Sequence, residues 1–288
     1  MTEKEKFMYK IMGKISESDV PIVFKGALVT KLILTENGYT ALERQTKDID
    51  ANWVDTPPSM DVLVEAINNS LGEFKNEMYA VAFREYGTKT SAGISIRGKD
   101  TDEEIISMDI SVKPVHGNKI YHYGEISIKG VLANEILSDK ITVMSKKMIF
   151  RRAKDIVDVY ALAHCVRVRT SEIFEIFRKN PNREVGIFDE FYNHRQEVEH
   201  AYEKLEGIED KPKFDGVYSY LKNFVRQFAE KDMIPKVWDN GKAVWENECR
   251  ERKPTMLEKL HKHKEEIKQN EQNHKNDTPK LKKNDIDL

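Results

Sequence analysis

Three aspartates have the type and spacing of a site for divalent metal ions. Asp48 and Asp50 lie two positions apart in segment 48–53, where polar and apolar residues alternate as in a strand with one packed face. This spacing puts both carboxylates on the same face, where two like charges favour a cation between them. Asp109 lies on the polar face of a second alternating segment, 104–112. Three oxygen ligands on neighbouring strands suit Mg²⁺ or Mn²⁺, which could bridge triphosphate oxygens and activate an attacking hydroxyl.

A glycine stands where an extended segment turns into a helix. The apolar run 21–24 is followed by Gly26 and then by a largely apolar helical segment up to residue 34. The backbone of such a glycine can approach a phosphate closely, and the free amides of a helix start bind anions. A simple turn would explain Gly26 equally well, and an Asp-x-Asp pair alone is more often solvated charge. The order of strand, glycine, helix and Asp48 strand favours the phosphate site, although segment 26–31 lacks the second glycine of a Walker loop.

Two helical segments carry further polar candidates. Lys140 lies at the edge of an apolar stripe, from which a long side chain can reach a cleft. Asp155 and Asp158 are three positions apart on the next helical segment, so they share a face. A carboxylate there could orient Lys140 or a nucleotide hydroxyl. Plain surface charge is the alternative for all three residues.

The elements that must position these residues change in character near residue 130. Four segments with strand character are separated by glycine turns, namely 79–86, 92–97, 104–112 and 120–128. Helical periodicity then dominates from residue 132 to about residue 268. We therefore expect an α+β protein with a mixed or antiparallel sheet in residues 1–130, an all-helical lobe in residues 131–269 and a flexible polar tail in residues 270–288.

Composition excludes several classes of protein. Of the 288 residues, 33% are charged, but the net charge is only −2, so any surface that binds nucleic acid must be local. The dense basic cluster that could form such a surface comprises Lys146, Lys147, Arg151, Arg152, Lys154, Arg167, Arg169, Arg178, Lys179 and Arg183; a solvated helix face is the alternative. Cys165 and Cys249 lack the spacing of a disulfide framework or zinc site, and His261, His263 and His274 receive no role. With no signal peptide and no apolar run that could span a membrane, we expect a cytoplasmic protein.

Four elements in a fixed order resemble a known family. They are Phe24-Lys25-Gly26-Ala27-Leu28, the segment from Arg44 to Asp50, Leu137-Ser138-Asp139-Lys140, and the segment from Arg152 to Asp158. Together they resemble the AbiEii/AbiGii toxin family of the polymerase-β-like nucleotidyltransferase superfamily. The resemblance spans roughly residues 23–164.

The resemblance implies a polymerase-β-like lobe followed by a helical lobe, and a toxin that transfers a nucleotide from an NTP using two divalent metal ions. It implies tRNA as the acceptor, as in related toxins, and an antitoxin as partner. By motif, the metal ligands are Asp48, Asp50 and Asp109, the other catalytic residues are Lys140 and Asp155, and the nucleotide contacts are Lys25, Gly26, Ala27 and Asp158. Ala27 departs from the glycine or serine usual in the family, so a side-chain contact to phosphate is lost.

Two other functions fit the same residues. The acceptor could be a hydroxyl of a protein or of a small molecule. The chain could also be a module that binds an NTP or an antitoxin without catalysis, because the Ala27 departure lies in the phosphate loop.

Overall fold

The computed structural model describes residues 1–39, 44–86, 91–146, 148–180, 185–208 and 210–248. Residues Met1–Asn247 form one compact unit, to which the following description applies. Several expectations lie outside the described residues: the tail 270–288, the helical periodicity beyond residue 248, and those for Lys147, Arg183, Cys249 and the three histidines 261, 263 and 274.

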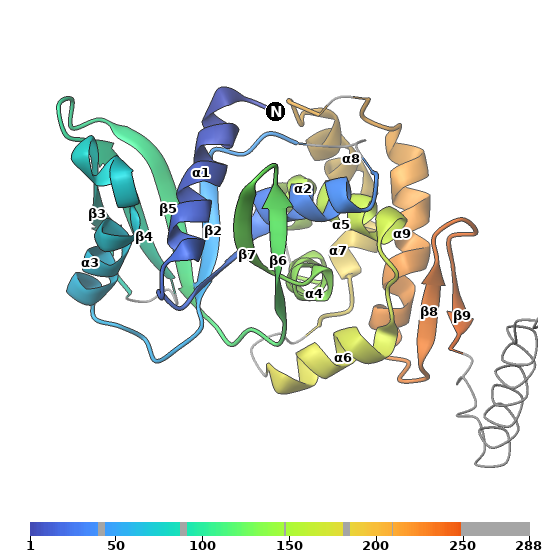
Figure 1. Ribbon diagram of the computed structural model, residues 1–288. Helices are drawn as coiled ribbons and strands as arrows, with labels where there is room; N and C mark the ends of the chain where they lie inside the picture. The colour runs from blue at the N-terminus through green and yellow to red at the C-terminus, as the bar shows by residue number, and fades with distance from the viewer. Residues whose placement is uncertain (40–43, 87–90, 147, 181–184, 209, 249–288) are drawn as a thin grey trace, which may run out of the picture. The chain divides into compact units, whose positions relative to one another are not determined.

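A mixed seven-stranded sheet forms the first part of the unit (Figure 1), which confirms the expected sheet type. Its strand order is β3-β4-β5-β2-β1-β7-β6. The pairs β1/β7 and β2/β5 are parallel, and the others are antiparallel. The bounds are β1 Ile22–Lys25, β2 Asp48–Trp53, β3 Met78–Arg84, β4 Ser91–Gly98, β5 Glu104–Val112, β6 Asn118–Tyr123 and β7 Ile126–Val131.

Helices dominate the rest of the unit. Among them α1 packs against β7 and α3, α3 packs against β3, and α2 contacts β2 as well as α4 and α5. The bounds are α1 Glu3–Glu17, α2 Gly26–Glu36, α3 Met60–Ser70, α4 Ala133–Met144, α5 Ala153–Cys165, α6 Thr170–Lys179, α7 Asp189–Asn193, α8 Arg195–Glu203 and α9 Phe214–Ala229. Short 3₁₀ helices are η1 Gly72–Asn76 and η2 Ile149–Arg152.

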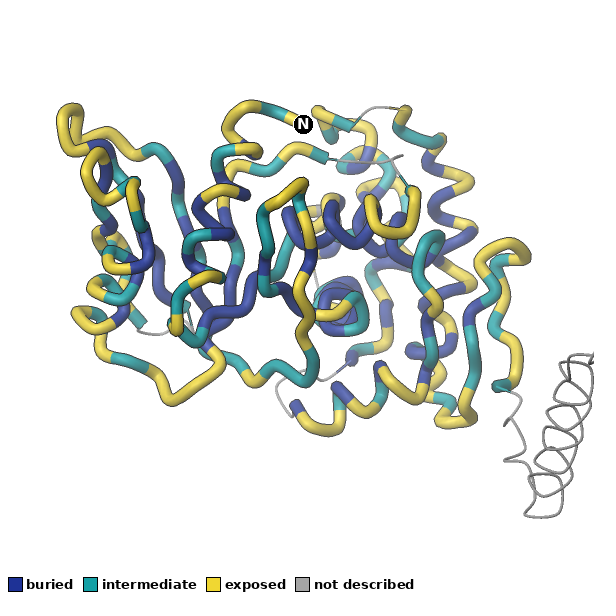
Figure 2. The backbone as a smooth tube through the Cα atoms, in the orientation of Figure 1, coloured by how far each residue is buried: buried dark blue, intermediate teal, exposed yellow. Residues whose placement is uncertain are grey.

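Helix α2 joins the sheet to the helical part. Every residue from Ala27 to Leu34 is buried, which fits a helix that is apolar on most sides and surrounded by other elements. Figure 2 shows the buried backbone concentrated in the inner strands and in the helices next to them. The start of α2 is therefore held rigidly between the two parts of the unit.

Two expectations about secondary structure are corrected. The segment 120–128 is a hairpin, because Gly124 adopts φ +58° between β6 and β7. The described part of the helical lobe also contains a second sheet, formed by β8 Lys236–Asp239 and β9 Val244–Asn247. Trp238 and Trp245 of this hairpin pack on Phe224 of α9 with ring centroids 5.1 and 5.4 Å away. Aromatic burial on α9 therefore stabilises two strands in a lobe expected to be all-helical, with β8 inside the predicted break in helical periodicity at residues 235–241.

No helix in the described part of the chain is long and apolar enough to cross a membrane.

A buried ion pair connects three segments near the site. Glu5 of α1 is fully buried and accepts a hydrogen bond of 2.6 Å from the ammonium of Lys31 in α2. The same carboxylate oxygen accepts the backbone N–H of Thr46 at 3.0 Å, just before β2. The pair thus fixes the loop that leads into Asp48.

We expect Glu5→Ala to lower the free energy of unfolding by about 3–5 kcal/mol, because it leaves the Lys31 charge buried without a partner. Chemical denaturation measures this loss. Glu3→Ala is the control, since Glu3 is 87% exposed and its loss should leave the free energy of unfolding nearly unchanged. Equal losses for the two variants would contradict the role of the buried pair.

Candidate active site

One row of residues crosses five strands of the sheet. Arg84 pairs with Gly93, Gly93 with Asp109, Asp109 with Asp50, and Asp50 with Lys25. Residues paired across strands project from the same face, so the two carboxylates stand side by side between two cations. Arg84 Nη2 donates to Asp109 Oδ2 at 2.9 Å, and the ring of Phe83 takes the place of a side chain at Gly93.

Asp50 is pressed against the start of α2. A Cβ built on Gly26 would overlap its carboxylate, and Gly26 has φ +72°, a backbone conformation that favours glycine. Burial, and next the charge of Asp48, raise the pKa of Asp50 to about 6. Gly26 is thus needed for both its conformation and its lack of a side chain. The ionised form of Asp50 is disfavoured at this position.

The carboxylates have the properties of a cation site. Asp48 is exposed and accepts the Thr46 hydroxyl at 2.9 Å. Asp109 Oδ1 is buried without a hydrogen-bond partner among the described residues, and Asp50 is destabilised by two neighbouring negative charges. Such a donor set fits a divalent ion. No three of these side chains are already grouped around one ion position in the described part of the chain, and Arg84 is bound to Asp109.

Lys25 lies farther along the same face. Its ammonium donates to Asn52 Oδ1 at 2.8 Å and to Ser111 Oγ at 3.0 Å. Burial lowers the pKa of Lys25. Lys25, expected to contact the nucleotide, is therefore directed toward the next row of the sheet.

A second charged group lies on the helical side. The Lys140 ammonium donates to Asp155 Oδ1 at 2.8 Å and to Asp158 Oδ2 at 2.6 Å. Arg44 binds Asp158 through two parallel hydrogen bonds of 2.9 Å, from Nε and Nη2. Arg152 approaches the other oxygen of Asp155 at 3.3 Å. The network ties the loop before β2 to helices α4 and α5.

The inner charges of this network compensate one another. Burial disfavours the charge of Lys140, but Asp158 and Asp155 outweigh it and raise the pKa of Lys140. Burial also disfavours the charge of Asp158, yet Lys140 and Arg44 lower its pKa below the ordinary value. Lys140 therefore remains an ammonium ion that points at its two carboxylates.

A cavity of about 970 Å³ lies beside both charged groups. Asp48, Asp50, Lys140 and Asp155 line it, together with Gly26 and Ala27 at the start of α2. Four further cations line it without a side-chain hydrogen bond or ion pair to another described residue, namely Lys47, Arg151, Lys154 and Lys204. A cavity with a helix start and free cations is suited to a polyphosphate.

The structure separates the expected site residues into groups. Six of the nine line the cavity, whereas Lys25, Asp109 and Asp158 do not; Asp109 and Asp158 are held by Arg84 and Arg44. Sequence reasoning assigns no role to either arginine. Arg44 lies in the motif itself, but nothing in a single sequence shows that it reaches α5, and Arg84 reaches Asp109 only because of the strand register.

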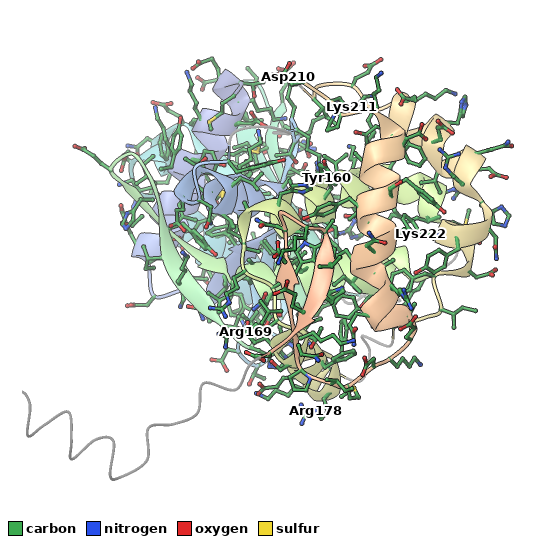
Figure 3. The ribbon with its side chains drawn as sticks, turned by 90° about the vertical axis from the view of Figure 1, so that its right-hand side faces the viewer. Tyr160, Arg169, Arg178, Asp210, Lys211 and Lys222 are labelled. Atoms are coloured by element: carbon green, nitrogen blue, oxygen red, sulfur yellow. The ribbon has the colours of Figure 1, made fainter. Side chains whose placement is uncertain are left out.

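The basic cluster also divides. Arg151, Arg152 and Lys154 line the cavity. Arg169 and Arg178 instead lie well away from Asp210 and Lys211, which follow the cavity-lining segment 204–208 (Figure 3). The basic surface that was expected to continue to these residues is therefore corrected to a shorter one around the cavity. Lys179 also does not extend it, because its ammonium pairs with Glu175 at 2.6 Å.

We expect Asp50→Asn to stabilise the fold in metal-free buffer. The pKa of Asp50 is about 6 in the folded protein and about 4 in the unfolded chain. The folded protein therefore loses stability as the pH rises from about 4 through about 6, because Asp50 then ionises in a setting that disfavours its charge. The gain from Asp50→Asn should thus be roughly 2–3 kcal/mol at pH 7.5 and smaller at pH 5. Urea denaturation with EDTA at both pH values measures it. Asp48→Asn, at an exposed position, should give little, and equal gains would contradict the assignment.

We expect Arg44→Ala to lower the free energy of unfolding by about 2–4 kcal/mol, because Asp158 loses two charge-assisted hydrogen bonds in a buried setting. Arg44→Lys should recover less than half of this loss, since lysine lacks the planar fork that matches a carboxylate. Thermal and chemical unfolding of both variants measure the difference. A lysine variant as stable as the unmutated protein would show that the two-pronged geometry is unimportant.

Three solved structures share similarity with the chain: JHP933 from Helicobacter pylori (15% identity, TM-score 0.43, covering 80% of this chain and 95% of that one), an antigenic nucleotidyltransferase-like protein from Paracoccidioides brasiliensis (16%, 0.41, 75% and 92%), and MenT4, a nucleotidyltransferase toxin from Mycobacterium tuberculosis H37Rv (11%, 0.38, 79% and 90%). No curated protein matches. The family model described as nucleotidyl transferase AbiEii toxin, type IV toxin–antitoxin system, matches residues 10–239. The chain therefore belongs to the AbiEii nucleotidyl transferase toxin family.

Proposed function

We propose that the protein transfers a nucleotide from an NTP to a hydroxyl group of tRNA, with two divalent metal ions. One observation carries the proposal: the cavity joins Asp48 and Asp50 to the start of α2 on one side and to Lys140 and Asp155 on the other. Anion-binding and cation-binding groups therefore face the same space, as a metal–triphosphate substrate requires.

The triphosphate is held by the start of α2 and the free cations. Gly26 and Ala27 offer backbone amides at the helix start, and Ala27 needs no hydroxyl for this. Arg151 and Lys154 supply unpaired positive charge from η2 and α5. Lys140 keeps its charge at the cavity wall and holds the carboxylates of Asp155 and Asp158 beside the triphosphate.

Asp48, Asp50 and Asp109 would hold the metal ions, which when bound neutralise phosphate charge and lower the pKa of an attacking hydroxyl. The hydroxyl oxygen forms a bond to the α-phosphorus, and the bond from that phosphorus to the bridging oxygen of pyrophosphate breaks. The hydroxyl proton passes to Asp50, the carboxylate that lines the cavity and whose pKa is raised to about 6.

RNA is favoured as the acceptor by the free cations of the cavity. Lys47 and Lys204, which the triphosphate does not use, come from separate segments around the opening and offer contacts to further phosphates. A protein or small-molecule hydroxyl would require neither of them. The type IV toxin–antitoxin assignment of the family supports a cognate antitoxin as a further partner.

We expect Asp48→Ala to abolish the labelling of tRNA by α-³²P-labelled NTPs in the presence of Mg²⁺, because one carboxylate of the cation site is lost. Asp61→Ala, which removes an exposed aspartate of α3, is the matched control and should retain activity. Labelled material that resists ribonuclease would favour a protein acceptor. Binding of NTP without release of pyrophosphate would favour a non-catalytic module, and unchanged labelling by Asp48→Ala would overturn the proposal.

A further inference from the structure

The cavity at the proposed site is one of two that meet at Asp50. The larger cavity includes Asp48, a smaller cavity of about 280 Å³ includes Asn52, and Asp50 lines both. These three residues are alternate positions on one face of β2, so the boundary between the cavities crosses the strand at Asp50. Each cavity therefore reaches the same carboxylate from its own end of the strand.

This arrangement suits a reaction with two substrates. In nucleotidyl transfer the attacking and leaving oxygens lie on opposite sides of the phosphorus atom. The larger cavity has Ala27, Arg151 and Lys154, which place the triphosphate there, and the smaller cavity has none of these residues. A hydroxyl that arrives through the smaller cavity would approach the α-phosphorus from the side away from the triphosphate.

The smaller cavity has its own free cations. Lys113 follows β5 and Lys146 follows α4, so they line the cavity from the sheet and from the helical part. Neither side chain forms a hydrogen bond or ion pair with another described residue, whereas Lys25 and Lys140 in the same cavity are fully engaged. Two unpaired ammonium groups that flank a small space favour a phosphodiester.

The size of the cavity limits its occupant. A volume of about 280 Å³ lies just below the range of roughly 300–1,000 Å³ for ligand pockets, so it has room for about one nucleotide. A folded protein segment would need an opening that accepts more than a single side chain. An RNA strand, in contrast, offers one nucleotide at its end with a phosphate directly before it.

We propose that the smaller cavity binds the terminal nucleotide of the RNA acceptor, with Lys113 and Lys146 on the phosphate that precedes it. The catalytic meaning of this site rests on the proposed nucleotidyl transfer. The binding itself does not, because the two lysines would hold an RNA end whether or not transfer follows.

The test is the binding of a single-stranded RNA with a free 3′ hydroxyl and a 5′ fluorescein, followed by anisotropy at several salt concentrations. The Lys113→Ala/Lys146→Ala variant should bind about tenfold more weakly, and the slope of log affinity against log salt should fall by about 0.7, the contribution of one phosphate on a single strand, since both lysines contact the same phosphate. Its affinity for NTP should not change. Lys113→Arg/Lys146→Arg should keep the binding and show that the fold is intact.

The matched control is Lys10→Ala/Lys222→Ala, which removes two exposed lysines of α1 and α9 outside both cavities. If this control and the Lys113/Lys146 variant lose equal affinity for RNA, the loss follows from the change in net charge alone, and the proposal is overturned. An equal loss of NTP affinity in the Lys113/Lys146 variant would assign the cavity to the triphosphate instead. If the unmutated protein labels no RNA, the proposed function fails, while the contrast in RNA binding still decides the second cavity.

Discussion

The burial of the Asp50 carboxylate beside the charges of Asp48 and Asp109 is the constraint on which the rest of the site depends. The parallel register of β2 and β5 places the carboxylates of Asp50 and Asp109 side by side, and the start of α2 presses on that of Asp50. Their charges are tolerated because cations stand at the ends of the row, with Arg84 on Asp109 and Lys25 next to Asp50. The raised pKa of Asp50 shows that this compensation is incomplete, so the row retains affinity for a further cation.

On the helical side of the cavity, buried charges are paired directly with charges of opposite sign. Lys140, Asp158 and Arg44 are almost removed from water, and each charge meets a partner of opposite sign at hydrogen-bond distance. Burying such charges costs about as much as their attraction returns, so the network contributes geometry more than stability. It fixes the ammonium of Lys140 at the cavity wall and joins the loop before β2 to α5. The carboxylates on the sheet side of the cavity thus keep uncompensated negative charge, whereas the charges on the helical side are paired with one another.

The sequence predicted the parts of the site that depend on local pattern. Alternation identified β2 and β5 and the face that carries Asp109, and the order of strand, glycine and helix identified the start of α2. The sequence could not predict contacts that are set by strand register, such as the hydrogen bond from Arg84 to Asp109, because these residues lie in separate strands of the sheet. The hairpin of β8 and β9 was missed for a related reason, since its strands are stabilised by aromatic packing on α9 and not by their own periodicity.

Net charge was equally uninformative, and the structure shows why. The 47 basic and 49 acidic residues nearly cancel over the whole chain. Many of the cations, such as Lys140 and Lys179, are already bound to carboxylates, so they add no field to the surface. The cations without such partners that line the two cavities come from separate segments, which only the fold brings together. Local attraction for phosphate can therefore arise in a chain of net charge −2, because it is decided by which charges remain unpaired and where they meet.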